Sequence, residues 1–209
     1  MKTKLYLWMM IIATVALPLA AGGRSESTPQ PGAGVPTREA ESETRTPVDP
    51  ETAQLVEQMG MLPFSHRVPV ENFIRPALAV ESRSLEESAG RFVLVNFWAS
   101  WCAPCREEMP SMQTLYDAME EMPFEMLAVN VLESREVAAG FINEFGFTFP
   151  VMLDRDGGLA RDFGVRGYPS TYLLDTGGAI IGTRLGFHDW GTDEAIAAMQ
   201  QLVATVDAE

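Results

Sequence analysis

The sequence predicts an α/β fold, with a central mixed β-sheet flanked by helices. Residues 92–98 and 124–131 are almost uniformly apolar, which is typical of buried parallel strands. Between them, residues 102–120 carry apolar side chains at helical spacing. A strand–helix–strand unit of this length predicts a right-handed parallel crossover. Two later apolar segments around a turn at 175–178 predict an antiparallel hairpin, so the sheet is expected to be mixed.

The N-terminal residues 1–21 predict an export signal. Lys2 and Lys4 give it a positive start, residues 5–19 are apolar, and small residues at 20–23 suit cleavage. An uncleaved membrane anchor is the alternative, although the apolar run is shorter than the ~20 residues of a full span. Either way, we expect the rest of the chain in the periplasm or on the outer face of the cytoplasmic membrane, where disulfides persist.

The next segments divide the chain by composition. Residues 22–50 are rich in Gly, Ser, Thr, Pro and Glu, and this composition predicts a disordered linker. Residues 51–68 predict a short amphipathic helix and a connector, and residues 69–207 the folded domain. At the start of that domain, residues 72–74 and 78–80 are strand candidates for an N-terminal hairpin extension.

The elements around the central crossover follow from caps and turn residues. Ser84 begins a helical turn that closes at Gly90, and Ser134 caps a helix that ends at Gly146. Pro150 cannot donate a backbone hydrogen bond, so the strand that contains it is expected at an edge. The expected elements after residue 131 are a helix over 134–145, a strand over 149–153, a short helix over 159–163, hairpin strands over 171–174 and 179–187, and a helix over 192–206.

Charge and cysteine content exclude several protein classes. The formal net charge of −14 excludes a nucleic-acid partner, since that function requires clustered Lys and Arg. Two cysteines are too few for a disulfide scaffold, so the fold must depend on its apolar core. We expect a monomer without a cofactor or a bound metal.

The two cysteines, Cys102 and Cys105, stand where the first buried strand ends and the helix begins. Unpaired N–H groups and the helix dipole stabilise a thiolate there, so Cys102 is expected to be the attacking sulfur. Cys105 follows one turn later, with Cβ atoms roughly 5–6 Å apart. A disulfide needs Cα atoms about 4.4–6.8 Å apart, so the pair can open and close without rebuilding the fold.

Three other interpretations of the cysteine pair remain open at this point. A zinc site needs two further ligands, and the sequence offers only His66 and His188. A non-catalytic copper-binding or metallochaperone module could use the two thiols with His188, because these ligands suit Cu(I). A structural disulfide closing so small a ring constrains the unfolded chain little.

The motif and its surroundings carry a resemblance to a known family. Residues 95–110 include Trp-Cys-Ala-Pro-Cys, and residues 129–131, 133–134 and 167–171 match as well. On these residues, the segment 69–206 resembles the thioredoxin superfamily. Within that superfamily it is most similar to the extracytoplasmic thiol:disulfide oxidoreductases of the TlpA/ResA group. The resemblance implies a thioredoxin-like fold, and no threonine motif of the peroxiredoxin kind surrounds the first cysteine.

The resemblance also implies roles for individual residues. Cys102 corresponds to the nucleophile and Cys105 to the resolving thiol of a redox-active disulfide. Pro169 corresponds to a cis-proline that faces the cysteines and, with Trp101 and Tyr168, contacts an extended substrate.

Glu108 is the candidate base of the site. Thioredoxins place a buried aspartate where this chain has Asn96, and they have a nearby lysine that is missing here. Cys105 must lose a proton when it attacks a mixed disulfide, so another base is useful. Glu108 lies one helical turn beyond Cys105 on the same face, and the ResA-like group has a glutamate at this place. Partial burial of the carboxyl would raise its pKa.

Together these features predict an exported enzyme, a thiol:disulfide oxidoreductase. We expect it to exchange, and in the cell to reduce, disulfides of protein substrates. A membrane electron donor of the thiol type would supply its electrons. The resemblance suggests cytochrome c maturation as its setting.

Overall fold

The computed structural model describes residues 46–205. The predicted export signal and residues 22–45 of the predicted linker lie outside the described residues. The described part forms one six-stranded mixed sheet and a separate two-stranded hairpin. The elements are α2 (Pro50–Gln58), β1 (Leu62–Pro69), β2 (Ile74–Pro76), β3 (Ser82–Ser84), η1 (Glu86–Ser88), β4 (Phe92–Trp98), α3 (Ala103–Ala118), β5 (Phe124–Val131), α4 (Arg135–Phe145), β6 (Val151–Asp154), α5 (Gly158–Asp162), β7 (Ser170–Leu174), β8 (Ala179–Leu185) and α6 (Asp193–Ala204).

The sheet has the strand order β1-β8-β7-β4-β5-β6 and confirms the predicted α/β class. β4 pairs in parallel with β5, and β5 with β6. β7 is antiparallel to both β4 and β8. β4 and β5 are buried along their whole length, which explains why both sequences are apolar without alternation.

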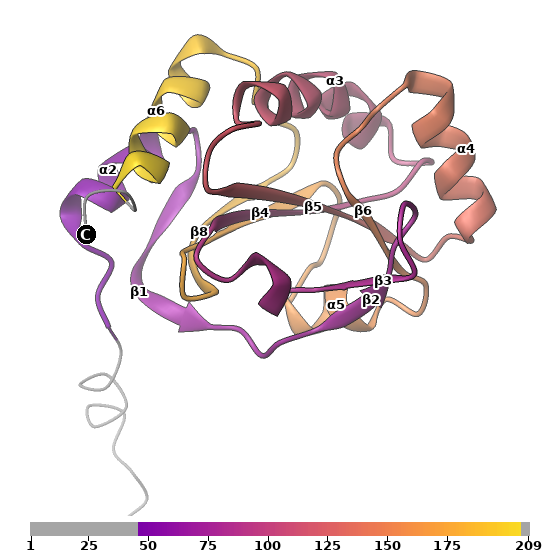
Figure 1. Cartoon of the computed structure of the whole chain (residues 1–209), viewed down its shortest axis with the longest axis horizontal. Coiled ribbons are helices and arrows are strands. Elements are labelled where there is room, and N and C mark those ends of the chain that lie inside the picture. Colours follow the sequence, from indigo (N-terminus) through magenta and orange to yellow (C-terminus); the bar gives the residue numbers. More distant parts are fainter. Residues whose placement is uncertain (1–45, 206–209) are drawn as a thin grey trace, which may run out of the picture.

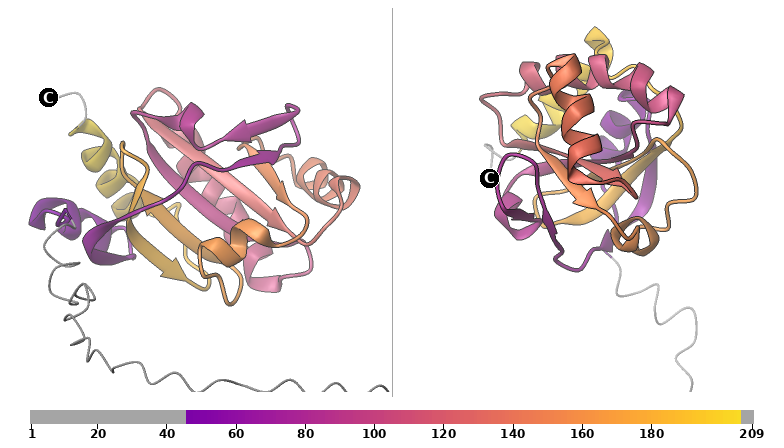
Figure 2. Two further views of the ribbon diagram at one scale, coloured as in Figure 1. Left: turned by 90° about the horizontal axis from the view of Figure 1, so that it is seen from below. Right: turned by 90° about the vertical axis from the view of Figure 1, so that its right-hand side faces the viewer.

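Helices cover both faces of the sheet (Figures 1 and 2). α2, α3, α4 and α6 lie over one face and share a large apolar cluster with it. α5 and the β2–β3 hairpin lie over the other face, around a second cluster that contains Phe97 and Tyr172. The end of β4, where the cysteines follow, is therefore held between two packed layers.

Ser134 and Gly146 act as the sequence predicts, whereas Ser84 does not cap the next helical turn, because it ends β3 and η1 has no side-chain cap. The Ser134 side chain accepts from the Val137 N–H at the start of α4, and Gly146 ends this helix with φ 72°. Thr192 caps α6 through the N–H of Ala195. These bonds satisfy helix-terminal backbone groups that would otherwise lack partners, so they fix where each helix begins or ends.

One segment differs from its prediction, because the connector expected within 51–68 contains strand β1. β1 pairs antiparallel with β8 at the edge of the main sheet. Pro63 and Pro69 obscured it in the sequence, yet proline is tolerated in edge strands. Pro47 forms a bridge with His66, and Val48 is buried, so ordered structure begins before the predicted linker ends at residue 50. The folded part of the chain therefore includes residues before residue 69.

The N-terminal hairpin exists, but its second strand is β3 and not the predicted segment 78–80. β3 is polar, which is why apolar content did not reveal it. Its Arg83 forms an ion pair with Glu125 of β5 at 3.4 Å, which ties the hairpin to the sheet. In the segment predicted as a strand, the Leu78 N–H donates to the Val151 carbonyl and so covers part of the β6 edge.

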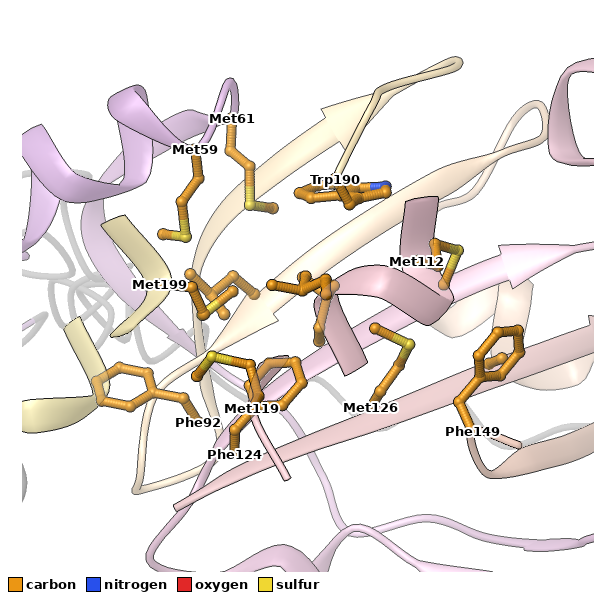
Figure 3. Packing of buried hydrophobic residues seen from close by; sticks show 14 of the residues in the cluster. Met59, Met61, Phe92, Met112, Met119, Phe124, Met126, Phe149, Trp190 and Met199 are labelled. Atoms are coloured by element: carbon orange, nitrogen blue, oxygen red, sulfur yellow. The ribbon is translucent and has the colours of Figure 1, made fainter. Parts of the chain in front are cut away.

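Methionine side chains fill much of the core between the helices and the sheet (Figure 3). Six of them surround the indole of Trp190 and the neighbouring aromatic rings: Met59, Met61, Met112, Met119, Met126 and Met199. Methionine is flexible and unbranched, so it fills the irregular space between α2, α3 and α6. Among residues 46–205, the helices are too short or too polar to cross a membrane.

We expect Gly182→Ala to lower the free energy of unfolding by about 1–3 kcal/mol. A Cβ at Gly182 would lie 2.6 Å from Cγ1 of Val56, which is buried in α2, and 3.3 Å from the Leu62 carbonyl oxygen. Urea unfolding would measure this loss. The matched control is Gly140→Ala in α4, where a Cβ meets no atom within 4 Å, and we expect it to stabilise the protein slightly. Equal effects of the two changes would contradict the packing of α2 on β8.

Candidate active site

Cys102 and Cys105 form a disulfide at the N-terminus of α3, and their Cα atoms are 5.3 Å apart. Cys102 is the N-cap residue, and its sulfur accepts a hydrogen bond from the Cys105 N–H at 3.3 Å. Cys102 is 6% exposed and Cys105 is 1% exposed, so Cys102 is the outer of the two sulfurs. The helix end therefore directs its free N–H groups at the sulfur that a substrate can reach.

An exposed apolar surface borders the disulfide. Trp101 is 63% exposed, and its ring lies 5.9 Å from that of Tyr168 in an edge-on arrangement. The Tyr168–Pro169 peptide bond is cis, as the resemblance implies. A groove along the loop before β7 is lined by Tyr168, Pro169, Phe163 and Leu185. The loop before β7 thus lies next to Trp101, and the predicted contact residues are brought together.

The loop that leads to Cys102 is held by Glu133, a residue to which the sequence assigned no role. The Glu133 carboxylate accepts from the Ser100 N–H at 2.8 Å, from the Ser100 hydroxyl at 2.5 Å and from the Asn130 amide at 2.6 Å. Leu132, just before it, has the left-handed φ of 62°, which is rare for a residue other than glycine. The family resemblance included residues 133–134, which marked Glu133 in the sequence. That resemblance alone did not reveal that its carboxylate bonds to Ser100.

Glu108 lies in α3 with no exposed surface, so its burial is deeper than the predicted partial burial. Its Oε1 accepts from Nε1 of Trp190 at 2.6 Å, and its Oε2 accepts from Nδ2 of Asn96 at 3.3 Å. Burial raises the pKa of Glu108 from 4.5 to about 7, although the bonds from Trp190 and Asn96 act in the opposite direction. A carboxyl in this setting can gain or lose a proton near neutral pH.

The buried network around Glu108 joins four parts of the fold. Asn96 of β4 also donates to Oγ1 of Thr171 of β7 at 2.9 Å. Trp190 reaches the carboxyl from the loop between β8 and α6, and it was not predicted from the sequence. No periodic pattern marks a single tryptophan in a loop, so only the folded chain reveals this contact.

His188 bears on the copper-binding alternative. Its ring packs against Trp190 with 4.6 Å between ring centroids, and a side chain at Gly60 would collide with it. Burial and the charge of Arg184 lower the pKa of His188. Within the part of the chain that the structure describes, no three His, Cys, Asp or Glu side chains are grouped to hold a metal ion. His188 therefore acts as a packing residue in this structure.

Comparison with known proteins gives a consistent result. The model of the AhpC/TSA family matches residues 67–182. The chain is 35% identical over 115 residues to "Thiol-disulfide oxidoreductase ResA" of Halalkalibacterium halodurans, covering 55% of this chain and 65% of that protein. It is 36% identical over 118 residues to "Thioredoxin-like protein YneN" of Bacillus subtilis, covering 55% of this chain and 68% of that protein. The matches thus span about two thirds of these relatives.

A solved structure shares the architecture. The crystal structure of a "putative Thiol:disulfide interchange protein DsbE" from Chlorobium tepidum is 27% identical to this chain. The match covers 67% of this chain and 96% of that one, with a TM-score of 0.58. The predicted thioredoxin-like fold is therefore confirmed.

The raised pKa of Glu108 predicts a pH-dependent stability for the oxidised protein. The unfolded chain loses this proton near pH 4.5, whereas the folded protein keeps it up to about pH 7. Between these values the folded state binds more protons, so stability falls as pH rises, by on the order of 3 kcal/mol. We expect Glu108→Gln to remove this fall in denaturant titrations from pH 4 to 8. Glu107→Gln, at the exposed neighbour, is the control and should retain the wild-type profile.

Proposed function

Because the chain belongs to the AhpC/TSA family, we propose that it exchanges disulfides with protein substrates through Cys102 and Cys105. The observation that carries this proposal is the disulfide at the start of α3, with its outer sulfur beside an exposed apolar surface. Trp101 and Tyr168 of that surface, together with Pro169, would contact an extended segment of the substrate.

The proposed reaction takes place in two steps. In the reduced protein, the Cys102 thiolate attacks one sulfur of a substrate disulfide, forms a mixed disulfide and releases the other substrate sulfur as a thiolate. Cys105 then loses its proton and attacks the Cys102 sulfur. This second step forms the Cys102–Cys105 disulfide and releases the second substrate thiolate, so two electrons pass to the substrate.

We assign to Glu108 the role of accepting the proton of Cys105. It follows Cys105 by one helical turn, and its pKa of about 7 suits proton transfer at neutral pH. Both Glu108 and Cys105 are buried, so bulk water has little access to either group.

The physiological direction that we propose is reduction. The protein would work outside the cytoplasm after export by residues 1–21, as a monomer, with electrons from a membrane donor of the thiol type. The resemblance to the ResA-like group supports cytochrome c maturation as the setting, where a disulfide of the apoprotein would be the substrate. The names of the similar proteins indicate thiol–disulfide exchange and no particular substrate.

Substitution of the two cysteines tests the proposed order of attack. We expect Cys102→Ser to abolish reduction of a disulfide-bearing protein, because the attacking sulfur is lost. We expect Cys105→Ser to accumulate a mixed disulfide, seen as a covalent adduct on a non-reducing gel, because the resolving sulfur is lost. Full activity of Cys102→Ser would overturn the assignment.

The reduction potential tests the direction. For a reductant, we expect the Cys102–Cys105 pair to lie nearer the about −270 mV of thioredoxin than the about −120 mV of a strong periplasmic oxidant. Equilibration with glutathione redox buffers, followed by alkylation of free thiols, measures this value. A potential near that of the oxidant would reverse the proposed direction.

A further inference from the structure

We propose that Trp190 is the positioning residue that holds Glu108 in its ionised form, one helical turn beyond Cys105. This inference rests on the proposed role of Glu108 in thiol exchange, which it deepens. The indole N–H of Trp190 bonds to Glu108 and to neither sulfur, so Trp190 would act through the carboxylate.

The first observation is the bond between the two side chains. Trp190 Nε1 lies 2.6 Å from Glu108 Oε1, and both residues are fully buried. The indole N–H can donate and cannot accept, so it cannot satisfy the proton of a neutral carboxyl. A hydrogen bond to a carboxylate is about twice as strong as one between neutral groups. The contact therefore favours the charged form.

The second observation is that Trp190 is fixed to α3 at both ends. Its backbone N–H donates to the Ser111 hydroxyl at 3.1 Å, and that hydroxyl donates to the Glu108 carbonyl at 2.7 Å. In Figure 3 the nitrogen end of the indole points to the side where Met112 of α3 lies. The other faces of the ring pack on His188 and the methionine core. The indole has no room to turn away from the carboxyl.

The remaining groups around Glu108 are weaker or more distant donors. Asn96 of β4 donates at the longer distance of 3.3 Å and shares its amide with Thr171. Arg184 of β8 favours the charged form by its field, but its guanidinium is bonded to the carbonyls of Gly60 and Phe187.

Two further neighbours complete the surroundings. In the loop, His188 contributes a backbone hydrogen bond to Glu108, while burial lowers the pKa of its ring, which stays neutral near pH 7. On α3 itself, the sulfurs of Cys102 and Cys105 are uncharged while they are bonded to each other. The short indole bond is therefore the main local support for the carboxylate.

The consequence for thiol exchange follows directly. Burial favours the protonated form of Glu108, and a protonated carboxyl cannot accept the Cys105 proton. With the indole bond in place, the carboxylate is available near neutral pH. Loss of this bond shifts the titration of Glu108 to higher pH, whereas loss of packing alone does not.

The first test observes the wild-type full chain by nuclear magnetic resonance. Each tryptophan gives one indole N–H resonance, and Trp190→Phe identifies that of Trp190. We expect this resonance to move between pH 5 and 9 with the same midpoint as the Glu108 carboxyl carbon. It should stay fixed in Glu108→Gln. A Trp190 resonance that stays fixed while the carboxyl titrates would overturn the proposal, whether or not any variant folds.

The second test compares two tryptophan substitutions. Trp190→Phe should raise the midpoint of the Glu108 carboxyl by about one pH unit. Trp98→Phe is the matched control, because Trp98 is equally buried and its N–H has no hydrogen-bond partner among the described residues. We expect Trp98→Phe to leave the midpoint unchanged. Equal shifts of the Glu108 midpoint in both variants would contradict the proposal and would show that Trp190 acts only through packing.

Both tests use the protein without a substrate. Failure of thiol exchange would therefore refute the proposed function while leaving the link between Trp190 and Glu108 standing. A fixed Trp190 resonance in a protein that still exchanges disulfides would refute only this inference.

Discussion

The fold buries a carboxyl group completely, one turn of α3 beyond the disulfide, and the proposed chemistry depends on it. Moving a carboxylate out of water costs several kcal/mol unless hydrogen bonds replace its hydration. Here the chain supplies donors from β4 and from the loop after β8, while α3 carries Glu108 itself. The cost is therefore only partly offset, which leaves the carboxyl able to change charge close to neutral pH. A fully compensated carboxylate would keep a low pKa and would be only a weak base near neutral pH.

The same helix fixes the geometry of the sulfurs. The buried strand β4 ends at Trp98, and a turn closed by the bond from the Cys102 N–H to the Ala99 carbonyl brings the chain into α3. Glu133 binds Ser100 within this turn from the end of the adjacent strand. The position of the outer sulfur is thus set by two parallel strands as well as by the helix. This arrangement keeps the reactive pair in place while the exposed Trp101 beside it remains free to contact a substrate.

The sequence was sufficient where local signals and burial agree. β4, α3 and β5 were predicted closely, because continuous apolar strands and a capped amphipathic helix have few alternatives. Prediction from the sequence failed for elements whose position depends on tertiary contacts and not on local composition. β1 contains two prolines and is tolerated at the sheet edge, and the polar β3 is held to β5 by the ion pair between Arg83 and Glu125. Trp190 lies 82 residues from Glu108, so nothing local could have joined them.

Both edges of the sheet are shielded, and this matters for a protein that would handle incompletely folded polypeptides. Beside β1, the chain at Pro47 and Val48 bonds to His66 and Ser65. Beside β6, Ala77 forms a bridge with Met152. Unpaired strand edges recruit extended chains and seed aggregation. With part of each edge occupied, a substrate polypeptide bound as proposed would meet side-chain surface around the disulfide and could leave after the exchange without extending the sheet.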